Sequence, residues 1–116
     1  MASVFTRVSY QVAVTVPGMT VDLIPRITAA QRLVLSRVRV VNVKPLGTRG
    51  YILRIPPSAA ESENTAILYG TPIHYGTPFD EHNIVLNASE GLSVAALCVG
   101  SPLLVFTAFG ELETIS

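Results

Sequence analysis

Branched side chains at every second position are the feature that most constrains how this chain folds. Val12, Val14 and Val16 show the alternation first, and the stretch LVLSRVRVVNV, residues 33–43, repeats it. Side chains two positions apart lie on one face of a β-strand, whereas an amphipathic helix needs apolar residues three and four positions apart. Helical spacing is scarce, and Gly and Pro interrupt the runs at short intervals. The pattern predicts an all-β protein, an antiparallel β-sandwich or jelly roll of about seven to nine strands.

The chain has 116 residues, which is a common length for one domain, and we predict a single domain over residues 1–116. Its middle lacks a clear period. PPSAAESENTA is followed by the doubled segment ILYGTPIHYGTP and then by FDEHN. Long stretches without periodicity inside a compact domain are usually functional or disordered. We therefore predict an irregular mid-chain strap at about residues 56–83.

The segment before the strap predicts a β-hairpin. KPLGTRG contains the residues of a chain reversal, and YILRI follows it directly. Alternation places Tyr51, Leu53 and Ile55 on one face of this strand and Arg54 on the other. We expect residues 33–43 to pair with this strand.

The doubled segment suggests a contact surface. Tyr69 and Tyr75 are six residues apart and share a face if the segment is extended, while Pro72 and Pro78 each remove a backbone donor. The segment therefore suits a sheet edge or an arm, and Tyr offers large contact area for little rotamer entropy. These four residues are candidates for a partner interface. The alternative is a structured loop whose tyrosines cover the open end of the sandwich.

Charge is unevenly distributed along the chain. All eight basic residues precede Pro56, and seven of the eight acidic residues follow it. Either strands from the two halves interleave and neutralise each other in cross-strand pairs, or separate charged surfaces meet between subunits. Arg37 and Arg39 share a strand face and are further partner-interface candidates. A net charge of zero, the absence of Trp and the lack of aromatic-basic interleaving disfavour nucleic acid as a partner.

The composition favours self-association and disfavours a membrane. Charged residues are 14% of the chain and mean hydropathy is +0.48, so part of the surface is expected to be covered by another subunit. The start of the chain alternates like a strand, so we expect no signal peptide. The uncharged stretch Leu92 to Phe109 is interrupted at Gly100 and Pro102, which favours two strands over a membrane span.

No pattern for catalysis or a cofactor is present in the sequence. His74, Asp80 and His82 carry ligand atoms, but HxxxxxDEH matches no standard metal motif, so they are weak ligand candidates. A GxSxG elbow and a phosphate-binding glycine loop are both missing, and Cys98 is the one cysteine. We predict a protein that is not an enzyme and holds no metal or cofactor.

The final third of the chain resembles one group of structural proteins. The match comprises Asn87, Ser89, Glu90, Gly91 and Leu92, in the turn NASEGL, and then Gly110 with Glu111 near the end of the last strand. This layout is similar to the small β-sandwich or jelly-roll virion proteins of tailed bacteriophages, of the head decoration or cement type. The resemblance implies a virion protein that is made in the host cytoplasm.

These observations predict a non-enzymatic structural protein that stabilises an assembled particle through subunit contacts. Its expected partners are copies of itself, with a trimer as one expected form, and a larger lattice such as a major capsid protein. The alternative is a carbohydrate-binding or receptor-binding module on the same fold, with Tyr69, Tyr75 and the FDEHN segment holding a sugar.

Overall fold

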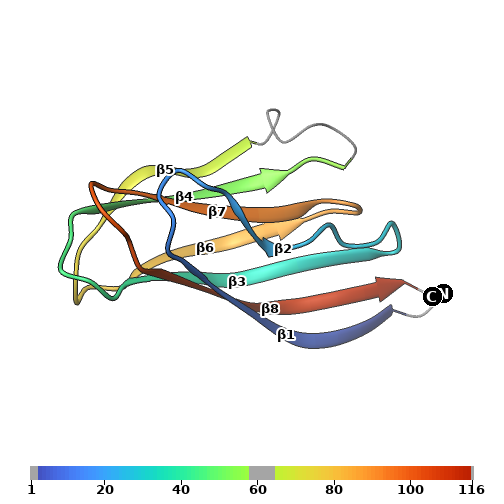
Figure 1. Ribbon diagram of the computed structural model, residues 1–116. Coiled ribbons are helices and arrows are strands. Elements are labelled where there is room, and N and C mark those ends of the chain that lie inside the picture. Colours follow the sequence, from blue (N-terminus) through green and yellow to red (C-terminus); the bar gives the residue numbers. More distant parts are fainter. Residues whose placement is uncertain (1–2, 58–64, 116) are drawn as a thin grey trace.

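The computed structural model describes residues 3–57 and 65–115, and these form eight β-strands in two layers (Figure 1). The number falls within the predicted range. The strands are β1 (Ser3–Val14), β2 (Val21–Ile24), β3 (Gln31–Asn42), β4 (Thr48–Ile55), β5 (Thr65–Ile73), β6 (Phe79–Leu86), β7 (Gly91–Leu97) and β8 (Leu104–Ile115).

The strands make two four-stranded antiparallel sheets. Sheet A has the order β1-β8-β3-β6 and sheet B the order β2-β7-β4-β5. All the strand pairs in both sheets are antiparallel. This order is that of an eight-stranded jelly roll. The structure therefore confirms the predicted antiparallel β-sandwich.

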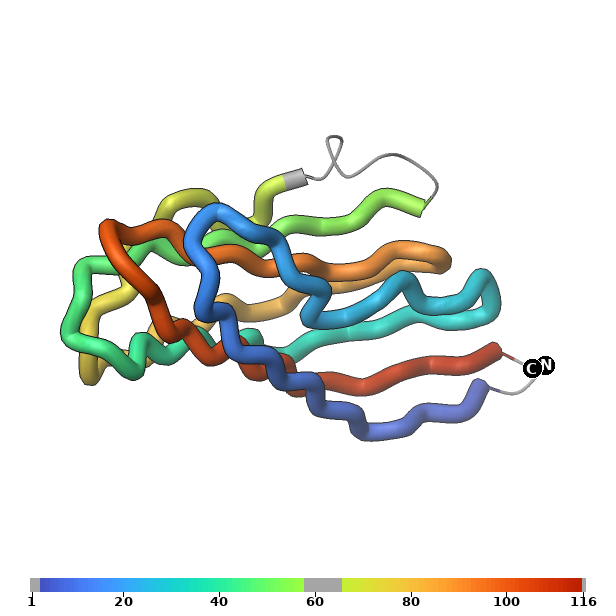
Figure 2. The backbone as a smooth tube through the Cα atoms, in the orientation of Figure 1, coloured from blue at the N-terminus to red at the C-terminus, as the bar shows by residue number. Residues whose placement is uncertain are grey.

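Most connections cross from one sheet to the other. β4 and β5 are the one pair of consecutive strands that stays within a sheet. The predicted hairpin of residues 33–43 with YILRI is therefore wrong, because β3 lies in sheet A and β4 in sheet B. The smooth tube in Figure 2 follows this crossing at the left of the molecule. Strands joined by short loops in this fold face each other across the core instead of pairing by hydrogen bonds.

The core fills the space between the sheets. One cluster of buried apolar residues includes members of both layers, and Phe106 is its largest fully buried side chain. On β3 every second residue points inward up to Leu35, and from Val38 onward the alternation resumes on even numbers, because β3 has an extra residue at Ser36. Leu33, Leu35 and Leu104 are fully buried. Fully burying one such side chain contributes about 1.5–3 kcal/mol. The alternation seen in the sequence is thus the alternation between core and surface.

The predicted irregular strap at residues 56–83 is wrong where strands occupy that range, whereas residues 56–57 and 74–78 lie outside the strands. Residues 65–73 form β5 and residues 79–83 belong to β6. Proline is compatible with β5 because that strand is at the edge of sheet B, where one side of its backbone needs no partner. The expectation that this segment suits a sheet edge is therefore confirmed. The rest of the strap, residues 58–64, lies outside the described residues.

In the described part of the chain, no helix is long and apolar enough to cross a membrane. The stretch Leu92 to Phe109 forms β7 and β8, as the interruption at Gly100 and Pro102 predicted. β7 is central in sheet B, and its residues 91–96 are all buried.

Candidate assembly surfaces

Four loops gather at one end of the sandwich, at the left in Figure 1. They are residues 15–20, 43–47, 74–78 and 98–103, which connect β1 to β2, β3 to β4, β5 to β6 and β7 to β8. We call this surface, together with Leu97 at the end of β7, the loop end. Backbone hydrogen bonds tie the loops to their neighbours: Gly18 N donates to Ala96 O over 2.9 Å, and Val43 N donates to Leu103 O over 3.0 Å.

The Asn42 side chain, at the end of β3, holds the β3–β4 loop against the end of β5. It is 2% exposed, and its Nδ2 donates to Leu46 O over 2.8 Å and to Ile73 O over 3.0 Å. Its Oδ1 accepts a hydrogen bond from Lys44 N over 3.1 Å. One buried amide therefore joins the β3–β4 loop to the end of β5. Because a buried amide is stable only when it is bonded, these contacts hold the loops in one arrangement.

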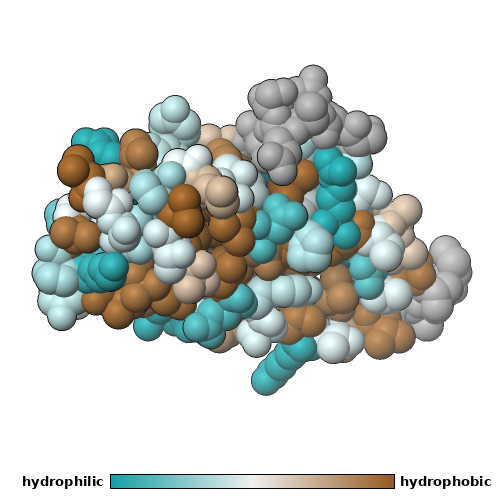
Figure 3. All heavy atoms as spheres, in the orientation of Figure 1, coloured by the Kyte–Doolittle hydropathy of each residue, from teal (hydrophilic) through white to brown (hydrophobic). Residues whose placement is uncertain are grey.

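The loop end is apolar although it faces solvent. Thirteen large hydrophobic side chains are exposed in the described residues, and seven of them lie on this surface. They are Val16, Met19, Val43, Leu46, Tyr75, Leu97 and Val99. Val99 is 97% exposed. Figure 3 shows hydrophobic residues gathered over the same part of the molecule. Between the loops lies a depression of about 850 Å³ whose lining includes Leu46, Tyr75, Val99 and the partly exposed Cys98.

The loop end carries little charge. Lys44 is the only Lys, Arg, Asp or Glu among the residues of its four loops, and its Nζ donates to Ser101 O over 3.2 Å. Arg49 of β4 also lines the depression. Large apolar patches on a soluble protein mark surfaces that another molecule covers. A preorganised and mainly apolar surface with two basic side chains fits contact with another protein.

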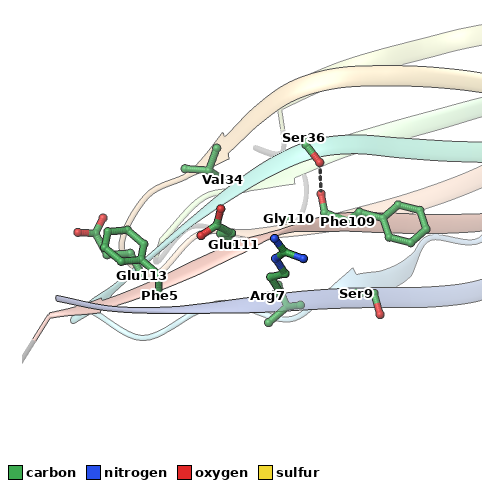
Figure 4. A pocket seen from close by; sticks show the side chains of 10 residues that line it. Phe5, Arg7, Ser9, Val34, Ser36, Phe109, Gly110, Glu111 and Glu113 are labelled. Carbon is green, nitrogen blue, oxygen red and sulfur yellow. Dashed lines mark hydrogen bonds between the residues drawn. The ribbon is translucent and has the colours of Figure 1, made fainter.

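A second depression lies on the outer face of sheet A (Figure 4). We call it the trough. It measures about 660 Å³, and Phe5, Val34, Phe109, Arg7 and Glu111 are among its lining residues. In Figure 4 the Arg7 side chain rises from β1 toward Glu111 on β8, its partner in the strand register. The trough therefore joins aromatic surface to opposite charges.

A backbone irregularity shapes the trough. Ser36 is an extra residue of β3 relative to β8, because the register shifts between Leu35 and Arg37. Its Oγ donates to Phe109 O over 3.1 Å. Beside it, Gly110 approaches β3 so closely that an added Cβ would lie 2.2 Å from Val34 O. Glycine is needed at this point because the backbones of β8 and β3 nearly touch.

Basic and acidic strands interleave in sheet A, as the first of the two charge interpretations expected. The basic strands β1 and β3 flank β8, which carries Glu111 and Glu113, and β3 also pairs with β6. Arg32 stands opposite Glu113 in the register. Basic and acidic residues that are separated along the sequence therefore stand opposite each other in sheet A, as at Arg7 and Glu111.

Arg37 and Arg39 share the outer face of sheet A, and both have partners within the chain. The Arg37 guanidinium lies over the Phe109 ring, 4.9 Å from its centroid. Arg39 makes a two-point ion pair with Asp80, with Nε–Oδ1 2.8 Å and Nη2–Oδ2 3.0 Å. This hydrogen bonding lowers the pKa of Asp80 and raises the pKa of Arg39. Their use in a partner interface stays a prediction.

The two tyrosines do not share a face. Gly70 has φ +63° and the β4–β5 register shifts nearby, so Leu68 and Ile73 both point inward although they are five residues apart. Tyr69 packs edge-on against Tyr51, with 5.1 Å between ring centroids. Tyr75 lies beyond the end of β5, in the loop end. The prediction of one tyrosine face is wrong because the irregularity at Gly70 reverses the alternation.

The other predicted residues are dispersed. Pro72 lies in β5, and Pro78 directly precedes β6; both are exposed. His74 lines the loop-end depression, whereas Asp80 and His82 lie opposite Arg39 and Arg37 in sheet A. Within the described residues, no group of three or more His, Cys, Asp or Glu side chains could hold a metal ion.

Most of the loop end was missed by reasoning from sequence. Val99, Met19 and Leu46 each lie beside Gly or Pro, and an apolar residue in such a turn is a signal of exposure. That signal identifies single exposed residues but does not show which of them lie on the same surface. Only the fold brings the four loops together.

No protein-family model matches this chain. No curated protein matches its sequence either. Solved structures share the fold. A structure of infectious bursal disease virus, Gx strain, aligns with a TM-score of 0.61 at 14% identity over 97% of this chain and 32% of that chain. The VP2 subviral particle of the same virus aligns at 0.57 with 12% identity, over 97% and 33% of the two chains. This chain spans about a third of the length of those viral chains.

A third structure matches over nearly its full length. A protein of Bacillus endospore appendages, which form disulfide-linked pili, aligns at a TM-score of 0.62 with 8% identity, over 100% of this chain and 93% of that chain. This chain is a jelly-roll β-sandwich similar to those proteins. At these identities the likeness concerns the fold.

Proposed function

We propose that this protein is a non-enzymatic structural subunit of an assembled protein particle, and that its copies join through the loop end. The observation that carries the proposal is the gathering of seven exposed large apolar side chains on loops fixed by hydrogen bonds. Contact between copies removes this surface from water, which contributes roughly 25 cal/mol per Å² of apolar area before the entropy of association is subtracted.

The comparisons support the same class. The two kinds of similar structure come from a virus particle and from pili, which are both assemblies of protein subunits. Within this class we propose a virion component of the head decoration or cement type of a tailed bacteriophage, as the turn NASEGL and the Gly110-Glu111 pair suggest by resemblance. Its partners are then copies of itself, as a trimer, and a major capsid lattice. Its location is the virion, after synthesis in the host cytoplasm.

The structure does not support the carbohydrate-binding alternative, because its residues lie on different surfaces. It requires Tyr69, Tyr75 and the FDEHN segment on one surface. Tyr69 packs against Tyr51 on sheet B, whereas Asp80 and His82 belong to β6 on the outer face of sheet A. Tyr75 lies in a third place, the loop end.

The test is a charged substitution at the most exposed point of the loop end. Val99 is 97% exposed, so Val99→Asp is expected to change the free energy of unfolding by less than about 0.5 kcal/mol. In an assembled interface the new carboxylate is buried without a partner, which disfavours association. Sedimentation velocity over a range of protein concentrations is expected to show multimers of the 12.4 kDa chain for the wild type, and for the variant a lower mean mass, because the species joined through the loop end are lost.

The matched control is Tyr69→Ser. Tyr69 is also exposed, at 77%, but lies on sheet B away from the loop end. This variant is expected to assemble like the wild type. Equal assembly by the wild type and Val99→Asp, or loss of assembly in Tyr69→Ser alone, contradicts the proposed role of the loop end.

A further inference from the structure

The sandwich has four edge strands, and each exposes backbone groups along one side. In sheet A these are β1 and β6, and in sheet B they are β2 and β5. An unprotected edge is a template that pairs with a strand from another chain. Folded proteins prevent such pairing with short edges, proline, charges or local distortions of the strand.

Three of the four edges carry such protection. β2 has only four residues, and its register with β7 is shifted. β5 contains Pro72 and is distorted at Gly70, which has φ +63°. β6 carries charges at Asp80 and Glu81 and contains Asn83 with φ 58°. A strand from another chain meets an obstacle at each of these edges.

β1 carries none of these devices except one charge. Its twelve residues, SVFTRVSYQVAV, include no proline or glycine, and Arg7 is the only charged residue. It pairs with β8 without a register shift from Ser3↔Ile115 to Val14↔Leu104, and none of its residues has positive φ. Figure 1 shows β1 along the lower border of the molecule, with no strand beyond it. It is a long and regular open edge.

We propose that the open edge of β1 pairs antiparallel with β1 of a second copy, about a two-fold axis at Ser9. The two A sheets then become one continuous sheet across the dimer. This rests on the proposed function in that the protein assembles from copies of itself, but it uses a different surface from the loop end. The recognition is by backbone hydrogen bonds, as in other cases of strand addition.

The side chains of β1 fit this register. When the axis passes through a residue, opposite residues have both odd or both even numbers, so the outer faces of the two sheets lie on the same side. An axis at Ser9 pairs all residues from Val4 to Val14. It places Arg7 opposite Gln11 and Phe5 opposite Ala13. An axis at Arg7 is disfavoured because it sets two like charges opposite each other.

The second copy is favoured over an unrelated strand because β1 is complementary to itself. In the proposed register the pair has a large aromatic residue, Phe5, opposite the small Ala13 at both ends. On the inner face, Tyr10 stands opposite Val8, which is a favourable aromatic and β-branched combination. The trough, whose lining includes Phe5, Arg7 and Ser9, is repeated on the same side of the joined sheet.

The axis is tested by cross-linking. Cys98 is the only cysteine, so Ser9→Cys in a Cys98→Ala background carries one thiol per chain. Opposite residues of an antiparallel pair are about 4.5–5.5 Å apart, which permits a disulfide. Gln11→Cys in the same background is the control, because its counterpart lies four residues along the partner strand, about 13 Å away. The first variant is expected to form a disulfide-linked dimer under mild oxidation, and the control is not.

A charge change tests the register in solution. Gln11→Glu sets a carboxylate opposite Arg7 of the second copy twice per dimer, and is expected to lower the dimer Kd roughly 2-fold to 30-fold. Gln11→Lys is expected to raise it. Within one chain Gln11 pairs with Thr107, which is uncharged, so neither change creates an ion pair with its neighbour on β8. Sedimentation equilibrium measures the Kd values.

The outcomes separate this proposal from the role of the loop end. Val99→Asp is expected to leave the Ser9→Cys cross-link intact, since the two surfaces are distinct. Equal cross-linking by the Ser9→Cys and Gln11→Cys variants, or the same Kd for both charges at residue 11, overturns the proposed β1 pairing. Neither result bears on the loss of assembly in Val99→Asp.

Discussion

Replacing Asn42 tests whether one buried amide holds the loop end together. The side chain makes three hydrogen bonds, with lengths of 2.8, 3.0 and 3.1 Å. At about 1 kcal/mol of net stabilisation for each bond, Asn42→Ala is expected to lower the free energy of unfolding by about 3 kcal/mol. For a domain of this size that corresponds to a fall in Tm of roughly 10–15 °C.

Asn42→Asp separates the loss of hydrogen bonds from the loss of volume. The carboxylate has nearly the same size and still accepts the bond from Lys44 N, but it donates to neither Leu46 O nor Ile73 O. Its charge also faces two carbonyl oxygens in a buried place. We expect this variant to be at least as destabilised as Asn42→Ala at neutral pH.

The assay is urea unfolding followed by far-ultraviolet circular dichroism, because the chain has no Trp to report by fluorescence. Asn87→Ala is the control, since Asn87 is an exposed amide in the β6–β7 turn and its loss is expected to change stability by less than about 0.5 kcal/mol. A loss below about 1 kcal/mol for both Asn42 variants refutes the account of how these loops are fixed.

Two further predictions concern sheet A. Gly110→Ala is expected to lower the free energy of unfolding by more than about 2 kcal/mol in the same assay, because the new Cβ would lie 2.2 Å from Val34 O. Gly47→Ala is the neutral control, because its Cβ meets nothing within 4 Å. Equal stability of the two variants contradicts this packing. Asp80 has a folded-state pKa below its ordinary value through Arg39, so its contribution is complete above the ordinary pKa near 4 and is lost as pH falls through the folded pKa. The stability difference between wild type and Asp80→Asn is therefore expected to shrink below about pH 4, and a constant difference contradicts it.

The class of fold could be predicted because alternation is a local signal. Val12 and Val14, or Leu33 and Leu35, show by spacing alone which side of a strand faces the core, and the structure confirms it for these residues. Pairing between strands is not local. The segment after β3 was expected to return beside it as a hairpin, but in a jelly roll it crosses to the other sheet, and no residue in KPLGTRG distinguishes these outcomes.

In β4 the predicted alternation is confirmed, because Tyr51, Leu53 and Ile55 lie on one face and Arg54 on the other, but the pattern did not show which face is inward. Arg54 stands beside the buried Leu92 in the register and points inward, and its Nη1 contacts Glu90 Oε1 at 3.1 Å and bonds to Val85 O. Such a partner lies 31 to 36 residues away in sequence. In β5 the irregularity at Gly70 reverses which side chains point inward. Counting residues along the sequence does not detect such an irregularity.

The candidate surfaces could be predicted only in part. Tyr75 was singled out and does belong to the loop end, but its apolar neighbours come from three other loops. The open edge of β1 also depends on which strands end each sheet, which is a property of topology. Local pattern therefore identified exposed residues without showing which of them form one surface.

The most direct test of the central claim is the mass of the purified wild-type protein in solution, by light scattering at several protein and salt concentrations. The account predicts masses that are multiples of 12.4 kDa, that rise with protein concentration and that persist in added salt, because the loop-end contact is apolar. A mass of 12.4 kDa at every concentration contradicts the proposal that copies of this chain assemble with each other.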